Sequence, residues 1–93
     1  MRRQLLRLTS FVRAAKRLIK KQPSAAEELR GALELLAEDA FHAQLKTHKL
    51  KGDLAGSWAC SAGYDLRIVF EFVQRDGTEA ISLQTVGTHA EVY

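Results

Sequence analysis

The chain of 93 residues is predicted to form one α+β domain over residues 1–93, with a helical hairpin packed on one face of an antiparallel sheet. Two observations predict this class. Residues 64–73 alternate at period two and present one wholly apolar face, which is typical of a strand covered on one side. Residues 9–40 instead repeat their apolar side chains at helical spacing. The expected element order is β-α-α-β-β-β.

The first three elements follow from the N-terminal half. Residues 4–8 predict an opening strand with Leu6 and Leu8 on one face, and Thr9 or Ser10 is expected to cap the first helix. Pro23 ends this helix, because the residue before proline is pushed out of the α region. The apolar stripe of the helix comprises Phe11, Val12, Ala15, Leu18 and Ile19.

The second helix is predicted to begin with a capping box at Ser24 and Glu27, in which each side chain bonds the amide of the other residue. The short connection makes the two helices an antiparallel hairpin, with a basic helix beside an acidic one. Its apolar stripe comprises Ala26, Leu29, Leu33, Leu36 and Ala40.

The C-terminal half predicts three strands. Residues 41–53 lose the helical period and are expected to form a loop, after which residues 54–62 form a strand with Trp58 and Cys60 facing the core. Gly63 marks the turn into the central strand, residues 64–73. The turn signal Asp76-Gly77 then places a last strand, residues 79–86, antiparallel to the central one.

Composition excludes several classes of protein. An apolar share of 46% excludes general disorder, and no apolar run approaches the roughly 20 residues of a membrane span. The lone Cys60 excludes an intramolecular disulfide, and no Cys/His pairs stand at zinc-ligand spacing. We therefore expect a cytoplasmic protein that needs no metal or cofactor.

Charge is unevenly distributed. The formal net charge is +3, yet residues 1–22 contain only basic charged side chains and residues 24–40 are mainly acidic. A second basic cluster comprises Lys46, Lys49 and Lys51. Such blocks fit either a polyanionic partner or an ordinary solvated surface.

Two segments read together indicate a family. The first runs from Thr47-His48-Lys49-Leu50-Lys51-Gly52 into Tyr64-Asp65-Leu66-Arg67-Ile68-Val69-Phe70, and the second is the ending Gly87-Thr88-His89-Ala90-Glu91-Val92-Tyr93. The chain resembles, over nearly its whole length, the RelE superfamily of type II toxin–antitoxin toxins. Its nearest members are YafQ-like toxins and RelE/StbE-type plasmid-stabilisation toxins.

This resemblance implies a metal-independent endoribonuclease that cuts mRNA in the A site of the 70S ribosome. In this chemistry the ribose 2′-OH attacks the adjacent phosphorus and leaves a 2′,3′-cyclic phosphate and a 5′-OH. A cognate antitoxin, encoded by an adjacent gene, would silence the toxin. A small basic domain is a natural target for an acidic antitoxin segment that folds on binding. Such a segment would bind either as a helix in a groove or as a strand added to the sheet.

The resemblance also assigns roles to residues. His48 or Asp65 would be the general base, His89 the general acid, and Arg67 a phosphate clamp. Tyr93 would stack on a base or orient the nucleophile. Ser61 stands about where YafQ-like toxins carry a further histidine, which leaves the acid and base assignments open. The lysines expected to bind RNA are Lys46, Lys49 and Lys51.

Other readings of these residues stay open. Arg67 could be a structural partner of Asp65 or Glu71, and the histidines could be solvated surface residues. Relatives of the ParE type inhibit DNA gyrase without cutting RNA, although they generally lack the histidines. A catalytically inactive module that only binds the antitoxin is the third alternative.

Overall fold

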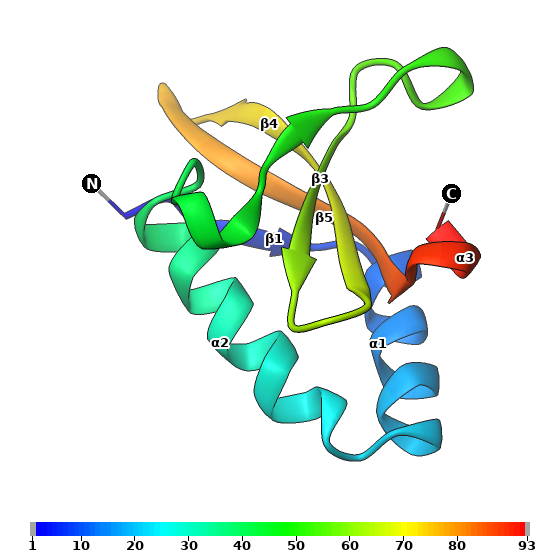
Figure 1. Cartoon of the computed structure of the whole chain (residues 1–93). Coiled ribbons are helices and arrows are strands. Elements are labelled where there is room, and N and C mark those ends of the chain that lie inside the picture. Colours follow the sequence, from blue (N-terminus) through cyan, green and yellow to red (C-terminus); the bar gives the residue numbers. More distant parts are fainter. Residues whose placement is uncertain (1, 93) are drawn as a thin grey trace.

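The computed structural model describes residues 2–92 and follows the predicted order with four short additions, η1, β2, η2 and α3 (Figure 1). The η elements are 3₁₀ helices. The elements are β1 (Leu5–Arg7), α1 (Thr9–Lys21), α2 (Ala25–Glu38), η1 (Ala43–Leu45), β2 (His48–Lys49), η2 (Gly52–Leu54), β3 (Trp58–Ala62), β4 (Leu66–Arg75), β5 (Thr78–Thr88) and α3 (His89–Val92).

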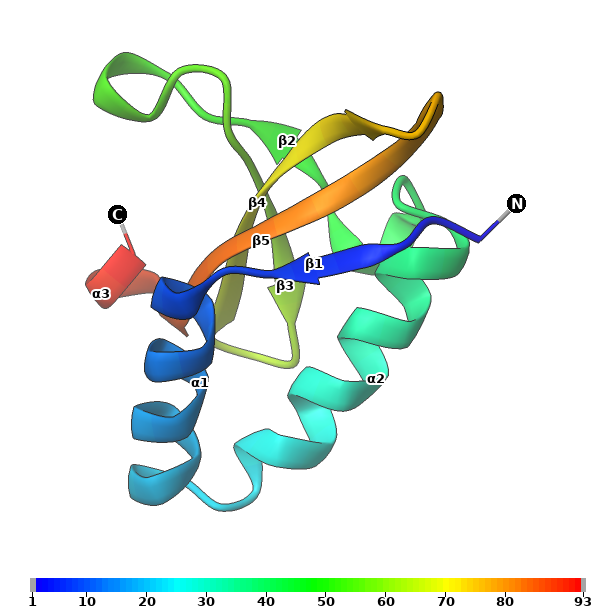
Figure 2. The ribbon, with the colours of Figure 1, turned by 180° about the vertical axis from the view of Figure 1, so that it is seen from behind.

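One five-stranded sheet, in the order β1-β5-β4-β3-β2, places β4 in the middle as predicted. The strands β2 to β5 pair antiparallel. β1 instead pairs parallel with β5, with Leu5 opposite Ile81, so the prediction of a purely antiparallel sheet is wrong at this edge (Figure 2). Parallel neighbours need a long crossover, and here the helices and three strands lie between them in the chain.

Both helices pack on one face of the sheet and form the core with it, which confirms the predicted layers. The centre of this core is fully buried, including Leu36 of α2, Ile68 and Phe70 of β4, and Ile81 of β5. The helices meet at residues 22–24 and diverge from there, so the hairpin has the shape of a V (Figure 1).

Several finer predictions about the core are wrong. Leu5, rather than Leu6 and Leu8, packs against the core from β1, and Leu8 is 44% exposed. Tyr64 is 95% exposed because it lies in the turn before β4, which begins only at Leu66. The strand expected over residues 54–62 begins at Trp58, because Leu54 ends η2 and residues 55 and 56 form a turn.

The predicted caps of α1 and α2 do not form. α1 begins at Thr9, with Leu8 as N-cap, and the Ser10 hydroxyl donates instead to the Gln84 carbonyl at 2.6 Å. Ser24 has helical backbone angles and no side-chain cap bond. The first amides of α2, those of Ala25 and Ala26, donate instead to the carbonyls of residues 22 and 23.

The β4–β5 hairpin forms as predicted and contains a bulge. Asp76 and Gly77 both have positive φ, at 52° and 77°, as a two-residue type I′ turn requires. Val69 lies opposite Thr85 whereas Phe70 lies opposite Leu83, so Gln84 is an extra residue in β5. The bulge keeps apolar side chains of β5 on the core face on both sides of it.

Candidate functional site

The sheet face opposite the helices, called here the open face, carries two of the predicted catalytic residues, His48 and Arg67. His48 lies opposite Ala59 of β3, and Arg67 of β4 lies opposite Ser61 of the same strand. Ala59 and Ser61 are two residues apart and so share a face. His48 and Arg67 therefore lie on one face, on strands whose backbones are about 10 Å apart.

His48 was expected in a loop but lies on the edge strand β2. Its Nδ1 is 2.9 Å from the Lys46 carbonyl oxygen. A carbonyl can only accept a hydrogen bond, so Nδ1 carries the hydrogen, and the proton-accepting nitrogen of the neutral ring is Nε2. Two local features hold this arrangement: Lys46 has a positive φ of 51°, and the Thr47 hydroxyl donates to the Ala40 carbonyl at 2.6 Å.

Arg67 is half-buried, and its Nη1 donates to the Leu66 carbonyl at 2.9 Å. Within residues 2–92 its guanidinium forms no ion pair with Asp65 or Glu71, which were its alternative structural partners. The one backbone hydrogen bond leaves most of the five donors of the guanidinium for an anionic ligand.

Asp65 and His89 meet at the end of the open face where β4 begins. The His89 amide donates to the Asp65 carbonyl at 3.0 Å, and both side chains are exposed. Gly87, two residues before His89, lies opposite Arg67. The fold therefore gathers Asp65, Arg67 and His89 at one end of β4 and β5, with His48 two strands away. Tyr93, predicted as the terminal aromatic of the site, lies outside the described residues.

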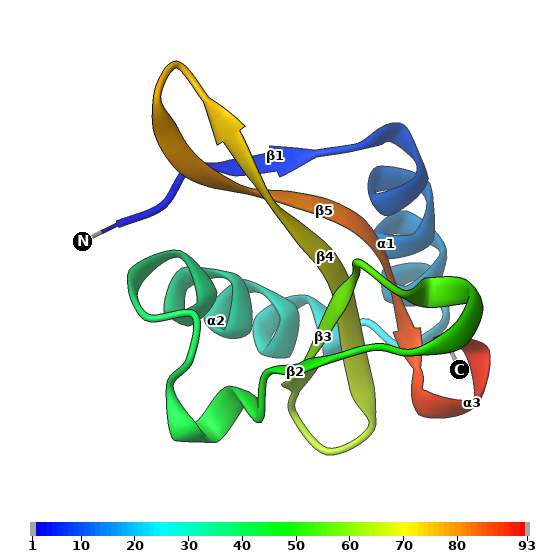
Figure 3. The ribbon, with the colours of Figure 1, turned by 90° about the horizontal axis from the view of Figure 1, so that it is seen from above.

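A short helix turn carries His89. Thr88 and Glu91 bond each other reciprocally: the Thr88 amide donates to Glu91 Oε1 at 2.9 Å, and the Glu91 amide donates to Thr88 Oγ1 at 3.3 Å. The bond from the Thr88 amide, together with an interaction of the Thr88 side chain with the carboxylate, lowers the pKa of the Glu91 carboxyl, with a smaller contribution from the positive charges of Lys21 and Arg17. In Figures 1 and 3, α3 and the η2 segment lie at the same side of the molecule.

The three predicted RNA-binding lysines are exposed and lie in different places. Lys46 precedes β2, and Lys51 precedes η2. Lys49 lies on the opposite face of β2 from His48, with Nζ 5.5 Å from the centroid of the Trp58 ring on the helix side. Lys49 is therefore not on the face that carries Arg67.

The open face also holds a polar network that sequence reasoning missed. The Ser57 hydroxyl donates to Gln84 Oε1 at 2.9 Å, and Gln84 Nε2 donates to Glu71 Oε1 at 2.5 Å. Ser57 is only 8% exposed. No motif indicates this network, because it depends on the bulge that turns the Gln84 side chain toward β4.

Trp58 and Cys60 are structural, as predicted. Trp58 is half-buried and packs edge-on against Phe41 and Phe72, with centroid separations of 5.5 and 5.3 Å. Cys60 is fully buried on the core face, and burial raises the pKa of its thiol to about 12, against a smaller opposing effect of the Arg67 charge. A thiol in this environment is not a nucleophile at neutral pH.

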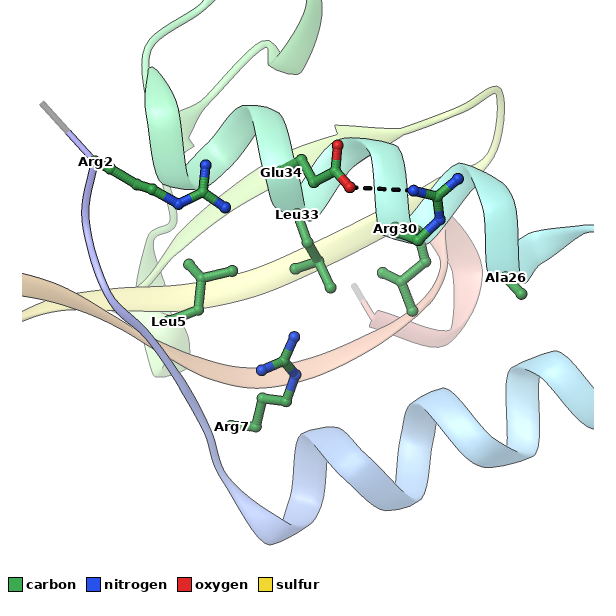
Figure 4. Close-up of a pocket in the computed structure, with 8 residues that line it drawn as sticks. Arg2, Leu5, Arg7, Ala26, Arg30, Leu33 and Glu34 are labelled. Atoms are coloured by element: carbon green, nitrogen blue, oxygen red, sulfur yellow. Dashed lines mark hydrogen bonds and ion pairs between the residues drawn. The ribbon is translucent and has the colours of Figure 1, made fainter.

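A hollow of about 330 Å³ lies away from the open face, between β1 and α2 (Figure 4). Leu5, Leu29 and Leu33 line it, with Arg2, Arg7 and Arg30 around them. Arg30 pairs with Glu27 and Glu34, and Arg2 pairs with Glu38, so these charges are largely balanced. None of the predicted site residues lines this hollow, which we call the β1–α2 groove.

Residues 2–92 contain no group of three or more His, Cys, Asp or Glu side chains that could hold a metal ion. Within the same range, no helix has both the length and the apolar character needed to cross a membrane.

Solved structures with the same fold include several bacterial toxins. YafQ from Escherichia coli strain BL21(DE3) matches with a TM-score of 0.78 and 17% identity, covering 98% of each chain. The E. coli DinJ-YafQ toxin-antitoxin complex matches with a TM-score of 0.76 and 18% identity, covering 100% of this chain and 99% of that one. The YoeB/ParE toxin from Agrobacterium tumefaciens matches with a TM-score of 0.74 and 17% identity, covering 92% of this chain and 98% of that one.

These matches define the fold, which is that of RelE-like toxin structures. A comparison with curated proteins gave no match. The family described as "Bacterial toxin of type II toxin-antitoxin system, YafQ" matches residues 3–93, and the chain belongs to this family. It is therefore the toxin of a type II toxin–antitoxin system.

Proposed function

We propose that this toxin is a metal-independent endoribonuclease that cuts mRNA, in the A site of the 70S ribosome. The observation that supports this most is the placement of His48, Arg67 and His89 around one open sheet face. A base, a cationic donor and an acid are the three groups that cleavage by the ribose 2′-OH requires.

In the proposed reaction the 2′-oxygen forms a bond to phosphorus and the bond from phosphorus to the 5′-oxygen breaks. The base takes the proton of the 2′-OH, and the acid gives a proton to the departing 5′-oxygen. The products are a 2′,3′-cyclic phosphate and a 5′-OH, so atoms and protons balance without water or metal.

His48 is the better candidate for the base. Its Nδ1 hydrogen is directed to the Lys46 carbonyl, which leaves Nε2 as the position that receives a proton. Asp65 is the alternative base. Arg67 would stabilise the negative charge that grows on the phosphate, because its guanidinium forms no carboxylate pair within residues 2–92. His89 would be the acid.

RNA binding is assigned to the lysines and to Tyr93. Lys46 and Lys51 are exposed on either side of β2, next to His48. Contacts of ammonium groups with phosphates are electrostatic and independent of sequence, so they suit a substrate that is held mainly by the ribosome. Tyr93 would stack on a base beside the scissile bond.

The test is mapping of mRNA 5′ ends after expression in a bacterium, with the wild type beside His48→Ala, Arg67→Ala and His89→Ala. We expect codon-phased cuts that are lost in all three variants, with a fall of about 10²- to 10³-fold for Arg67→Ala. Lys20→Ala, which removes an exposed charge of α1, is the control and should cut normally. Growth arrest without cuts would favour gyrase inhibition, and neither effect would indicate an inactive module.

The partner proposal concerns the β1–α2 groove. Within residues 2–92, β1 pairs only with β5, so its other edge offers unpaired backbone groups beside an apolar floor. We assign to this edge an extended antitoxin segment whose carboxylates face Arg7. Strand addition of this kind combines main-chain hydrogen bonds with pockets for alternate side chains.

Charge reversal tests this placement. Arg7→Glu should weaken antitoxin binding on the order of tenfold, because a like charge then faces the acidic segment. Arg13→Glu, an equal change on the exposed face of α1, is the control. RNA cleavage should be unchanged in both variants, since Arg7 is remote from the open face. Equal antitoxin affinity of Arg7→Glu and wild type would contradict the placement.

A further inference from the structure

The helix α3 is too short to be stable by itself. It has a single turn, His89–Val92, whereas isolated helices below about 12 residues are marginal in water. Its stability must therefore come from specific contacts. The reciprocal bonds of Thr88 and Glu91, at 2.9 and 3.3 Å, form a capping box at its first turn. His89 is the residue that directly follows the cap.

Contacts with the sheet fix the turn in place. The His89 amide donates to the Asp65 carbonyl at 3.0 Å, which ties the start of α3 to the start of β4. Glu91 lies directly over Gly87: a Cβ added to Gly87 would be 3.1 Å from Glu91 Oε1 and 3.3 Å from its Cβ. Gly87 is the strand residue opposite Arg67, so the absence of a side chain there lets the box close beside the arginine.

Charge on α1 supports the ionised form of Glu91. A hollow of about 380 Å³ separates α1 from β5 and α3, and Arg17, Lys21, Thr88 and Glu91 are among the residues that line it. The Thr88 hydrogen bonds are the main reason that the pKa of Glu91 is lowered, and the Lys21 and Arg17 charges add a smaller contribution that also favours the carboxylate. An ionised Glu91 accepts the hydrogen bond of the Thr88 amide more strongly than a neutral one.

We propose that Thr88 and Glu91 are positioning residues of the nuclease: their reciprocal bonds order α3 and so hold His89 beside Asp65 and Arg67. This inference rests on the proposed function, because it concerns the placement of the proposed general acid. Neither residue touches the substrate in this scheme. They act through His89.

Conservative and disruptive variants test the proposal together. Glu91→Ala and Thr88→Val each remove one bond of the box, and we expect kcat to fall about 10- to 100-fold with KM unchanged, as for a catalytic group displaced by about 1 Å. Glu91→Gln and Thr88→Ser keep the acceptor oxygen and should restore most of the activity. Glu27→Ala, at an exposed carboxylate of α2, is the matched control.

A measurement that does not depend on cleavage activity separates the positioning role from the proposed nuclease function. Backbone ¹⁵N relaxation should show ordered amides at residues 89–92 in the wild type and Glu91→Gln, and fast motion in Glu91→Ala, with the melting temperature unchanged. If α3 is disordered by Glu91→Ala but no protein cuts RNA, the proposed function fails and the placement stands.

Three results would overturn the positioning role. One is unchanged order and cleavage in both Glu91→Ala and Thr88→Val. Another is a loss in Glu91→Gln as large as in Glu91→Ala, because charge rather than the capping bond would then matter. The third is a rise in KM at unchanged kcat, which would place Glu91 in substrate binding.

Discussion

Replacing the bulge residue Gln84 by alanine should destabilise the whole domain. The Gln84 side chain accepts a hydrogen bond from Ser57 and donates one to Glu71, whereas its carbonyl, bonded by Ser10, is kept in the variant. Ser57 is 8% exposed, so its hydroxyl loses an acceptor where water has little access. An unsatisfied buried polar group costs about 1–3 kcal/mol in the free energy of unfolding.

The expected effect is large for a domain of this size. Domains typically have an unfolding free energy of about 5–15 kcal/mol. For domains of 60–100 residues, each kcal/mol lost lowers the melting temperature by about 4–8 °C. A loss of about 2 kcal/mol should therefore lower the melting temperature by about 8–16 °C, measured by circular dichroism. Gln74→Ala is the control, because Gln74 is an exposed residue of the same hairpin.

A double-mutant cycle decides whether the reasoning is correct. Ser57→Ala removes the hydroxyl that Gln84→Ala leaves without its acceptor, and removing both partners of a buried hydrogen bond is often nearly neutral. The double variant should therefore be no less stable than Gln84→Ala alone. Additive losses, or a melting temperature of Gln84→Ala equal to that of Gln74→Ala, would refute the role of the network.

Three further predictions concern single side chains. Because burial raises the Cys60 pKa from 9.0 to about 12, the folded state favours the neutral thiol. The free energy of unfolding should then fall as pH rises above 9.0, and it should fall less in Cys60→Ala. A thiol reagent at pH 8 should modify Cys60 only in unfolded protein. Lys49 lies over Trp58 and off the open face, so Lys49→Gln should weaken RNA binding without lowering kcat; a slower single-turnover cleavage at saturating enzyme would contradict this. Ser61→His should raise the cleavage rate, because it adds an imidazole opposite Arg67. An unchanged pH–rate profile would argue against a role of this imidazole in proton transfer.

Long elements could be predicted from the sequence and short ones could not. β4 and the two helices carry enough apolar side chains for their period to be read. β2 has two residues, His48 and Lys49, and forms only because β3 lies beside it. The bulge at Gln84 likewise exists only as a mismatch between two strands. Neither feature leaves a periodic signal in its own segment.

The fold brings predicted site residues together, but their geometry could not be predicted from the sequence. The family resemblance named His48, Asp65, Arg67 and His89, and the fold places His48 and Arg67 on one face and the other two at its end. Resemblance could not tell that Lys49 lies on the opposite face, because a one-residue step along a strand reverses the direction of the side chain. Predicted strand boundaries are too inexact to decide such a step.

The capping-box pattern shows why a local motif needs its structural context. A serine or threonine followed by glutamate three residues later occurs at Ser24–Glu27 and again at Thr88–Glu91. Only the second forms a box. Before α2 the chain turns through residues 22 and 23, whose carbonyls already accept the amides of Ala25 and Ala26.

Before α3 the chain arrives in the extended backbone of β5, which supplies no such turn. The Thr88 and Glu91 side chains then have unsatisfied amides to bond, and Gly87 provides the space for them. In the first pattern the glutamate therefore forms a surface ion pair, between Glu27 and Arg30. In the second pattern the glutamate helps to order the proposed catalytic residue His89. The backbone entering the helix decides between them.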